Sequence, residues 1–275
     1  NFISSYGLKL IILASVLSSF LLIILFDLKY GICPLGIIPL RIDYNHRSEQ
    51  VSQLLYGDCF KIIDQRKGWF MIRNQWDSYE GWITSNQCQE IPEEVYKSNA
   101  DLELRHSSNL MDYISLPNSE LFPIPLGSDL RQLDFLKHKF EGEFSTLKGK
   151  DQLISTAFSY LNAPYLWGGK SPLGIDCSGF TQMVYKLNGI VLKRDASQQA
   201  KQGITLSFIE ESEPGDLAFF DDKEGAITHV GVLLQDHRII HAHGKVRIDA
   251  IDQTGIYNKE LQNHSHKLRM IKKIV

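Results

Sequence analysis

The chain has 275 residues, of which 43% are hydrophobic and 22% are charged, and its formal net charge is −3. This length is enough for two or three small domains, and the composition is that of an ordinary globular protein. The slightly negative charge gives no indication of a surface that binds nucleic acid, so we expect no nucleic-acid partner.

The hydrophobic segment 10–26 lies near the start of the chain and contains no charged residue. As a helix it would be about 25 Å long, slightly short of a hydrocarbon core of about 30 Å. It is interpreted as a membrane anchor or uncleaved signal, or as a non-native extension, since the first residue is Asn rather than Met. If 1–28 is non-native we expect a cytoplasmic protein; otherwise we expect a membrane-anchored protein of the cell envelope.

Residues 29–91 form five short strand-like runs separated by turn signals, which is typical of a small, strongly bent β-barrel. Residues 92–149 are interpreted as a second small β module or an elaborated linker. Within that part we expect a short helix and three strands, at Glu93–Ser98, Leu102–Arg105, Leu121–Ser128 and Phe140–Phe144.

Cys177 follows a turn-rich stretch and precedes a run with helical character, Phe180–Leu187. We therefore expect it in the first turn of a helix, where unpaired N–H groups and the helix dipole favour a thiolate. Such a position next to a histidine lowers a cysteine pKa from about 8.5 into the range of about 3.5–7.5. The alternative is a small buried hydrophobic residue. The other cysteines, Cys33, Cys59 and Cys88, are interpreted as reduced core residues, and no Cys-x-x-Cys pair indicates structural zinc.

The C-terminal part, 150–275, begins with a predicted helix over Lys150–Tyr160 and continues as strands that carry histidines. A hairpin centred on Gln235 would pair His229 with His241, and a shifted register would pair His229 with His243. In either register His229 has a histidine partner across the strand. Such a pair is best explained as a general base and the residue that orients it. A zinc site would need Cys177 and a fourth ligand that the sequence does not reveal, so we expect no metal and no cofactor.

Five motifs together resemble the NlpC-type cell-wall peptidases, which are papain-like cysteine peptidases. They are Pro164–Gly169, Gly174–Phe180, Glu213–Leu217, Thr228–Gly231 and Ile240–Ala242. The resemblance implies an α+β papain-like domain, with a helix-borne Cys packed on an antiparallel sheet, preceded by one or two small SH3-like barrels. It implies Cys177 as nucleophile, His229 as base and His241 as the third polar residue, with His243 where the family commonly has a small residue.

The sequence around Gly68-Trp69 and Glu80–Ile83 resembles bacterial SH3-like domains. Its combination with this catalytic part resembles the γ-D-glutamyl-L-diamino acid endopeptidases. The resemblance implies cleavage between D-γ-Glu and diaminopimelate or Lys in murein peptides with a free N-terminal L-Ala, in peptidoglycan recycling or turnover. It implies that Asp176 pairs with the substrate ammonium. The other implied substrate-binding residues are Ser178, Tyr165, Trp167, Asp195, Glu49 and Tyr79. We expect a monomer whose partner is this murein peptide.

Two other functional classes remain open at this point. The same catalytic fold hosts amidases and acyltransferases, which would not need an acidic residue before the cysteine. A non-catalytic murein-binding protein is the other alternative, and it would be favoured by an incomplete set of catalytic residues.

Overall fold

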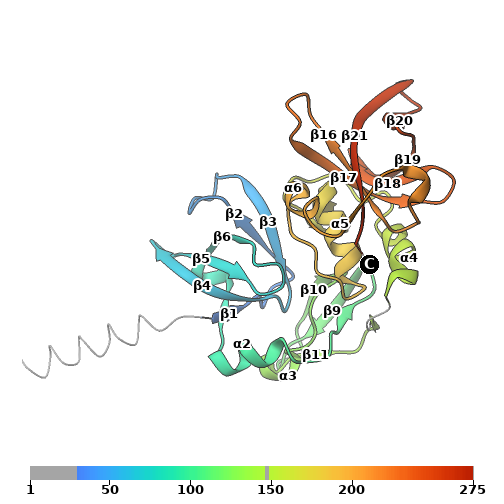
Figure 1. The fold of residues 1–275 in the computed structure, drawn as a ribbon. Coiled ribbons are helices and arrows are strands. Elements are labelled where there is room, and N and C mark those ends of the chain that lie inside the picture. Colours follow the sequence, from blue (N-terminus) through green and yellow to red (C-terminus); the bar gives the residue numbers. More distant parts are fainter. Residues whose placement is uncertain (1–29, 146–148, 275) are drawn as a thin grey trace, which may run out of the picture.

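The computed structural model describes residues 30–145 and 149–274, which form three parts placed side by side (Figure 1). The hydrophobic segment 10–26 lies outside the described residues. Within the described ranges, no helix is both long and apolar enough to cross a membrane.

The first part is a strongly bent sheet of seven strands in the order β3-β2-β6-β5-β4-β1-β7. Its hairpin between β4 and β5 has a two-residue turn, Lys67-Gly68, and both residues have positive φ. Such a turn matches the twist of the flanking strands, which is why glycine is favoured there. The strands are β1 (Tyr30–Ile32), β2 (Ile37–Arg41), β3 (Gln50–Leu55), β4 (Cys59–Arg66), β5 (Trp69–Asn74), β6 (Glu80–Thr84) and β7 (Gln89–Glu90).

The second part packs beneath the other two and contains little regular structure (Figure 1). The predicted helix is present as α2 (Glu93–Asn99), but the strand expected at Leu102–Arg105 is absent because these residues have no neighbouring strand to pair with. The strand expected over Phe140–Phe144 is divided, since its two ends pair with different strands. The remaining elements are β8 (His106–Ser107), β9 (Met111–Ser115), β10 (Leu121–Pro125), α3 (Leu133–Leu136), β11 (Lys139–Phe140) and β12 (Phe144–Ser145).

The third part is a sheet in the order β15-β21-β16-β17-β18-β19-β20, with short helices beside it. Because β20 also pairs with β21, the sheet closes on itself. Its strands are β15 (Ile204–Leu206), β16 (Leu217–Asp221), β17 (Ile227–Leu234), β18 (Arg238–His243), β19 (Lys245–Ile251), β20 (Gly255–Asn258) and β21 (Asn263–Lys273). The other elements are η2 (Lys150–Gln152), α4 (Leu153–Ser159), β13 (Lys170–Ser171), β14 (Gly174–Ile175), α5 (Cys177–Lys186), α6 (Ala196–Gln199) and η3 (Ile209–Glu211).

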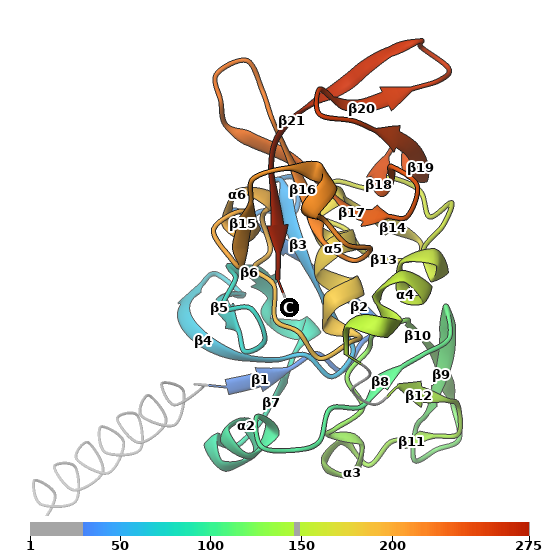
Figure 2. The same ribbon diagram turned by 45° about the vertical axis from the view of Figure 1, so that its right-hand side comes forward.

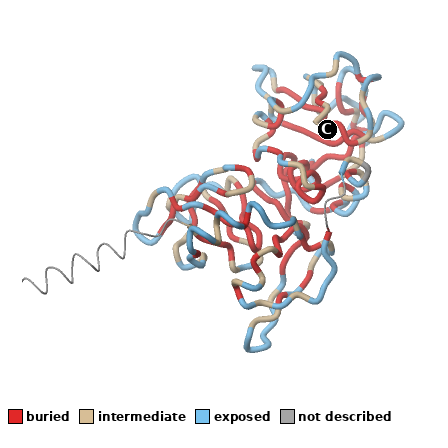
Figure 3. Tube along the Cα trace, turned by 60° about the horizontal axis from the view of Figure 1, so that its bottom comes forward, coloured by how far each residue is buried: buried red, intermediate tan, exposed pale blue. Residues whose placement is uncertain are grey.

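Helix α5 is buried along its whole length and lies between the first part and the closed sheet (Figure 2). Its side chains Phe180, Met183 and Val184 share one core with Val230 and Ile240 of the sheet. The tube coloured by burial shows buried backbone running from the first part through α5 into the sheet (Figure 3). The helix is therefore held from both sides. The domain limits at 91 and 149 stay predictions.

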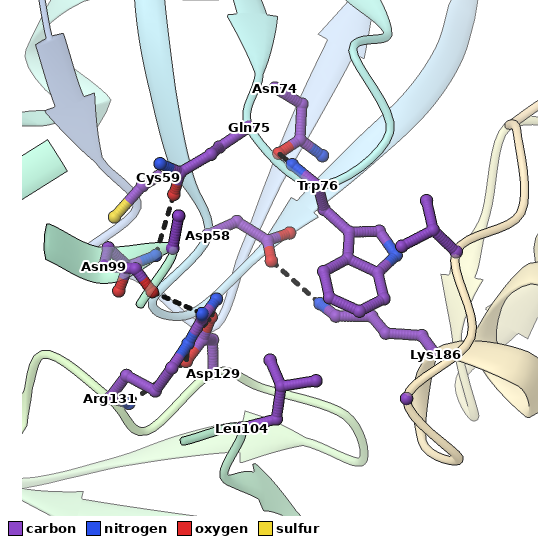
Figure 4. Close-up of a pocket in the computed structure, with 13 residues that line it drawn as sticks. Asp58, Cys59, Asn74, Gln75, Trp76, Asn99, Leu104, Asp129, Arg131 and Lys186 are labelled. Atoms are coloured by element: carbon purple, nitrogen blue, oxygen red, sulfur yellow. Dashed lines mark hydrogen bonds and ion pairs between the residues drawn. The ribbon is translucent and has the colours of Figure 1, made fainter. Parts of the chain in front are cut away.

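Two buried ion pairs lie where the three parts meet, and one of them joins the first part to α5 (Figure 4). Lys186, at the end of α5, donates to Asp58 of the first part at 2.9 Å, and the two side chains are 1% and 2% exposed. Nearby, Arg131 of the second part pairs with Asp129. Buried pairs of this kind tolerate little displacement, because separating them would leave a charge without a partner in a region of low dielectric constant.

Candidate active site

Helix α5 begins at Cys177, as the sequence predicts, and Asp176 is its N-cap residue. The Asp176 carboxylate accepts a hydrogen bond from the Gly179 N–H at 2.6 Å, which satisfies one of the free donors of the first turn. A Cβ at Gly179 would lie 2.3 Å from the carbonyl oxygen of Gly169. Only glycine therefore lets the start of the helix approach the preceding loop this closely.

The pKa of the Cys177 thiol is raised, whereas the sequence predicts a lowered one. Burial, together with the neighbouring Asp176 carboxylate, raises the pKa of Cys177 to about 12. The helix start favours a thiolate, but in this structure the loss of hydration and the negative N-cap outweigh it. The Cys177 thiol is consequently neutral near neutral pH.

The hairpin of β17 and β18 places His229 and His241 together, with His229 Nε2 and His241 Nδ1 2.8 Å apart. The register centred on Gln235 is wrong. His241 lies opposite Gly231, because the hairpin has a three-residue loop in which Asp236 and His237 have positive φ. This is the shifted register, and it leaves the side chains of His229 and His241 on one face of the sheet.

A carboxylate continues this chain of hydrogen bonds. His241 Nε2 lies 3.0 Å from Asp249 Oδ2, and Asp249 is held by two bonds from Arg247, at 2.7 and 2.9 Å. Although burial raises the pKa of Asp249, its bonds to His241 and Arg247 lower it to about 2. Burial lowers the pKa of both His241 and His229. The site therefore contains an ionised carboxylate and two neutral imidazoles.

A further histidine packs against the His229 ring. His266 of β21 stacks on it with ring centroids 4.2 Å apart and planes at 26°. Burial lowers the pKa of His266 to about 4, so it is neutral near neutral pH. A neutral aromatic neighbour restricts the orientation of the His229 ring without adding charge beside it.

The Cys177 thiol lies against the backbone of Val230, the residue next to His229, and this backbone contact acts to lower its pKa. Among the described residues, no hydrogen bond joins the thiol to His229. The Nε2 of His229 is used by His241, which leaves Nδ1 for the thiol. In structures without substrate, catalytic hydrogen bonds are often long and shorten in the complex.

A cleft of about 500 Å³ opens beside Cys177, between the first part and the closed sheet. Two hydrogen bonds cross it from the first part. Trp167 Nε1 donates to Glu49 at 2.6 Å, and the Tyr79 hydroxyl donates to Asp195 at 3.1 Å. The cleft collects seven of the residues that the sequence nominated: Glu49, Tyr79, Trp167, Asp176, Cys177, Ser178 and Asp195.

The expectation that Asp176 pairs with a substrate ammonium does not agree with its contacts. Arg194 is 1% exposed and donates to both Asp176 carboxylate oxygens, at 3.0 and 2.6 Å, and to Ser178 Oγ at 2.9 Å. Gly168 N–H donates to the same carboxylate at 2.8 Å. Both carboxylate oxygens of Asp176 thus have partners within the protein. The acidic groups that remain in the cleft are Glu49 and Asp195.

Two other nominated positions lie at the edge of the site. Tyr165 is 37% exposed, and burial together with the nearby Cys177 and Asp176 raises the pKa of its phenol to about 12, so it stays a hydrogen-bond donor. His243 is exposed at the end of β18, and its ring is 6.3 Å from that of His241. In the part of the chain that the structure describes, the hydrogen-bonded histidine partner of His229 is His241 and not His243.

Residues 30–145 and 149–274 contain no cluster of three or more His, Cys, Asp or Glu side chains placed to hold a metal ion. Sequence reasoning missed three residues of the site: Arg194, Asp249 and His266. Of these, only Asp249 could have been found from the sequence, because it lies two residues beyond Arg247 and so on the same face of the strand. Arg247 pairs with His241 in the sheet. Arg194 and His266 reach the site only through folding.

A cysteine at the start of a helix, next to a hairpin that carries a histidine pair on its two strands, is the arrangement expected of a papain-like cysteine hydrolase. Residues 162–265 match the NlpC/P60 family, and residues 40–87 match the family described as bacterial dipeptidyl-peptidase Sh3 domain. The chain therefore contains an NlpC/P60 cysteine peptidase domain preceded by a bacterial SH3 domain. This pair of domains is found in bacterial proteins.

Curated relatives resemble most of the chain. A gamma-D-glutamyl-L-lysine dipeptidyl-peptidase of Bacillus cereus is 29% identical over 70% of this chain and 66% of the relative, slightly less than two thirds of its length. A protein of the same name from Bacillus subtilis is 27% identical over 86% of this chain and 83% of the relative. Dipeptidyl-peptidase 6 of Lysinibacillus sphaericus is 26% identical over 78% and 89%.

Solved structures resemble the fold. An NlpC/P60 family protein from Bacillus cereus covers 90% of this chain and 99% of its own, with a TM-score of 0.74 and 17% identity. An NlpC/P60 endopeptidase from Photobacterium damselae covers 88% of this chain and 70% of its own, with a TM-score of 0.65 and 16% identity. The papain-like fold with an N-terminal SH3-like domain, predicted from the sequence, is confirmed.

Proposed function

We propose that this protein is a cysteine endopeptidase that hydrolyses the bond between D-γ-Glu and a diamino acid in murein peptides with a free N-terminal L-Ala. The observation that carries the proposal is the cleft beside Cys177, whose walls come from both the SH3-like part and the catalytic part. The names of two of the relatives agree with this reaction, and the third is named as a dipeptidyl-peptidase.

The acidic residues of the cleft select a substrate with a positive charge at its end. We assign the ammonium of the terminal L-Ala to the space between Glu49 and Asp195. The Tyr79 hydroxyl holds Asp195 from the SH3-like side, and Trp167 holds Glu49 from the catalytic side. An ammonium within hydrogen-bond distance of these carboxylates gains charge-assisted bonds that an acetylated amine cannot form.

The reaction begins with a neutral thiol and a neutral imidazole. His229 Nδ1 takes the proton of Cys177 as the sulfur attacks the γ-glutamyl carbonyl, because burial disfavours the separated ions before substrate binds. The Cys177 backbone N–H, at the free start of α5, and the Tyr165 hydroxyl are the donors we assign to the oxyanion. Removing one such donor typically lowers the rate by about 10²–10³. The His229 imidazolium then protonates the departing amine, and water hydrolyses the thioester.

The proposal is tested with the peptide L-Ala-γ-D-Glu-diaminopimelate, its Lys counterpart and the N-acetylated form of each. We expect cleavage of the free peptides at the γ-glutamyl bond, no cleavage by Cys177→Ala, and little or no cleavage of the acetylated forms. Products are identified by mass spectrometry. Equal cleavage of free and acetylated peptides would contradict the ammonium assignment, and cleavage of neither would favour an amidase or acyltransferase.

Asp195→Asn gives the matched test of the acidic wall. It keeps the size of the side chain and removes the charge, so we expect kcat/KM for the free peptide to fall by about 10–100-fold, the usual value of a hydrogen bond to a charged group. The control is Asp64→Asn, which removes a carboxylate that forms an ion pair with Arg66 at the surface of the SH3-like part. Equal effects of the two substitutions on kcat/KM would show that the charge of Asp195 does not contribute to substrate binding.

A further inference from the structure

His241 can accept or donate at Nδ1, and the choice decides whether His229 can act as a base. A neutral imidazole carries one proton, on either Nδ1 or Nε2. If His241 carried it on Nδ1, it would donate to His229 Nε2, and the His229 proton would have to sit on Nδ1. His229 would then present an N–H to the thiol and could take no proton from it.

The contacts of Asp249 exclude that arrangement. An ionised carboxylate only accepts hydrogen bonds, so His241 Nε2, 3.0 Å from Asp249 Oδ2, must carry the proton. His241 Nδ1 is then an acceptor, and across the 2.8 Å contact His229 Nε2 must be the donor. The His229 proton is thereby fixed on Nε2, and Nδ1 is left as a bare nitrogen.

Arg247 keeps Asp249 in the required state. Its two bonds to the carboxylate occupy both oxygens and hold the charge in place. In the sheet, Arg247 lies opposite His241, and Asp249 is the diagonal neighbour on the same face. Asp249 is 8% exposed and His241 is 0% exposed, so water competes little for these bonds.

We propose that Asp249, clamped by Arg247, is a positioning residue that fixes the tautomer of His241 and thereby leaves His229 Nδ1 free to accept the thiol proton. When His229 becomes an imidazolium, its Nε2–H continues to donate to His241 Nδ1, and no proton moves between His241 and Asp249. This role rests on the proposed function, because it serves the base of that reaction. It adds a fourth residue to Cys177, His229 and His241.

The test is a double-mutant cycle between positions 249 and 241. In His241→Asn the amide oxygen is bonded to Cγ, the same carbon that carries Nδ1 in histidine. An amide oxygen is always an acceptor, so it can accept the hydrogen bond from His229 Nε2 without any help from Asp249. We expect Asp249→Ala to lower kcat/KM by about 10–100-fold with His241 present, as loss of an outer partner of a functional histidine commonly does. In the His241→Asn background the same substitution should change the rate by less than about threefold, within the scatter of such measurements. An equal loss in both backgrounds would overturn the proposal.

Nitrogen NMR of the histidine rings gives a readout that needs no substrate. In the wild-type protein at neutral pH we expect His241 to show a protonated Nε2 and a bare Nδ1, and Asp249→Ala to move it towards a mixture. A protonated Nδ1 in the wild type would overturn the proposal even if the enzyme is active. If the wild type cleaves no murein peptide, the proposed function fails while this spectrum still decides the tautomer. Asp249→Asn, which keeps the volume, replaces Asp249→Ala if that variant unfolds.

Discussion

At Cys177, two local effects on the thiol oppose each other. The first turn of α5 favours negative charge, whereas burial and the N-cap carboxylate of Asp176 disfavour it. Arg194 neutralises part of the Asp176 charge, yet the pKa of the thiol remains raised. The resting site therefore differs from a preformed thiolate–imidazolium pair, and the proton must move as the sulfur reacts.

This difference can be measured by alkylation with iodoacetamide. Because the thiolate is the nucleophile and the pKa of Cys177 is raised, we expect its alkylation rate to increase by up to about tenfold per pH unit through neutrality. Mass spectrometry separates Cys177 from Cys33, whose pKa burial also raises and which serves as the internal control. A rate that is level between about pH 5 and 8 would indicate an ion pair and contradict the neutral resting state.

Among the secondary-structure elements, α5 connects the active site to the SH3-like part. Its first residue is Cys177, the proposed nucleophile, and its last, Lys186, forms the buried pair with Asp58. Burial raises the pKa of Asp58, but the ammonium groups of Lys186 and Lys170 lower it below its usual value. Gln182, one turn earlier, donates to Asp77 of the same part at 2.9 Å. The wall of the cleft is thus positioned by the same helix that positions the cysteine.

Breaking this pair should destabilise the protein strongly. Lys186→Met leaves the Asp58 carboxylate buried without its nearest partner, so we expect a loss of about 3–5 kcal/mol in the free energy of unfolding. The matched control is Arg73→Met, which breaks an exposed pair with Glu80 and should cost at most about 1 kcal/mol. Urea unfolding measures both variants.

The double variant Asp58→Asn/Lys186→Met separates loss of the pair from loss of packing. It leaves no buried charge at these two positions, so we expect it to recover part of the stability lost by Lys186→Met. If Lys186→Met costs no more than Arg73→Met, the pair does not hold the two parts together.

In the molecule as a whole, histidines are buried as neutral groups in two separate parts. Burial lowers the pKa of His106, in the second part, to about 4, and lowers those of His229, His241 and His266 in the closed sheet. In the unfolded chain each regains a pKa of about 6.5. Between these values the unfolded state binds more protons than the folded state, so stability rises with pH there.

We therefore expect the free energy of unfolding to be complete above about pH 6.5 and to decrease as the pH falls towards 4. Each buried histidine adds at most about 1.4 kcal/mol per pH unit to this slope. Asp249, whose pKa is about 2, should lose its contribution only at lower pH. Thermal or urea unfolding across this range measures the slope of the free energy of unfolding against pH. His106→Gln should reduce this slope by up to about 1.4 kcal/mol per pH unit, the contribution of one proton. A stability independent of pH between 4 and 6.5 would contradict neutral burial of these side chains.

Features that depend on near neighbours in the chain could be predicted from the amino-acid sequence alone. The start of α5 at Cys177 and the bounds of β17 and β18 follow from local turn signals and from the alternation of side chains along a strand. The motifs around Cys177 and His229 indicated the catalytic class, and Glu49 and Tyr79, which were chosen by loop position alone, line the cleft beside Cys177. These are short-range patterns, readable without knowledge of which strands pair.

Features that depend on contacts between residues far apart in the sequence could be seen only in the folded structure. The hairpin register followed from the backbone of Asp236 and His237, and the neutralisation of Asp176 required Arg194, 18 residues away. The stacking of His266 on His229 required β21 to return beside β16 and close the sheet. The raised pKa of Cys177 depends on how deeply the fold buries the thiol. Burial and long-range pairing are properties of the packed molecule, so no local pattern could reveal them.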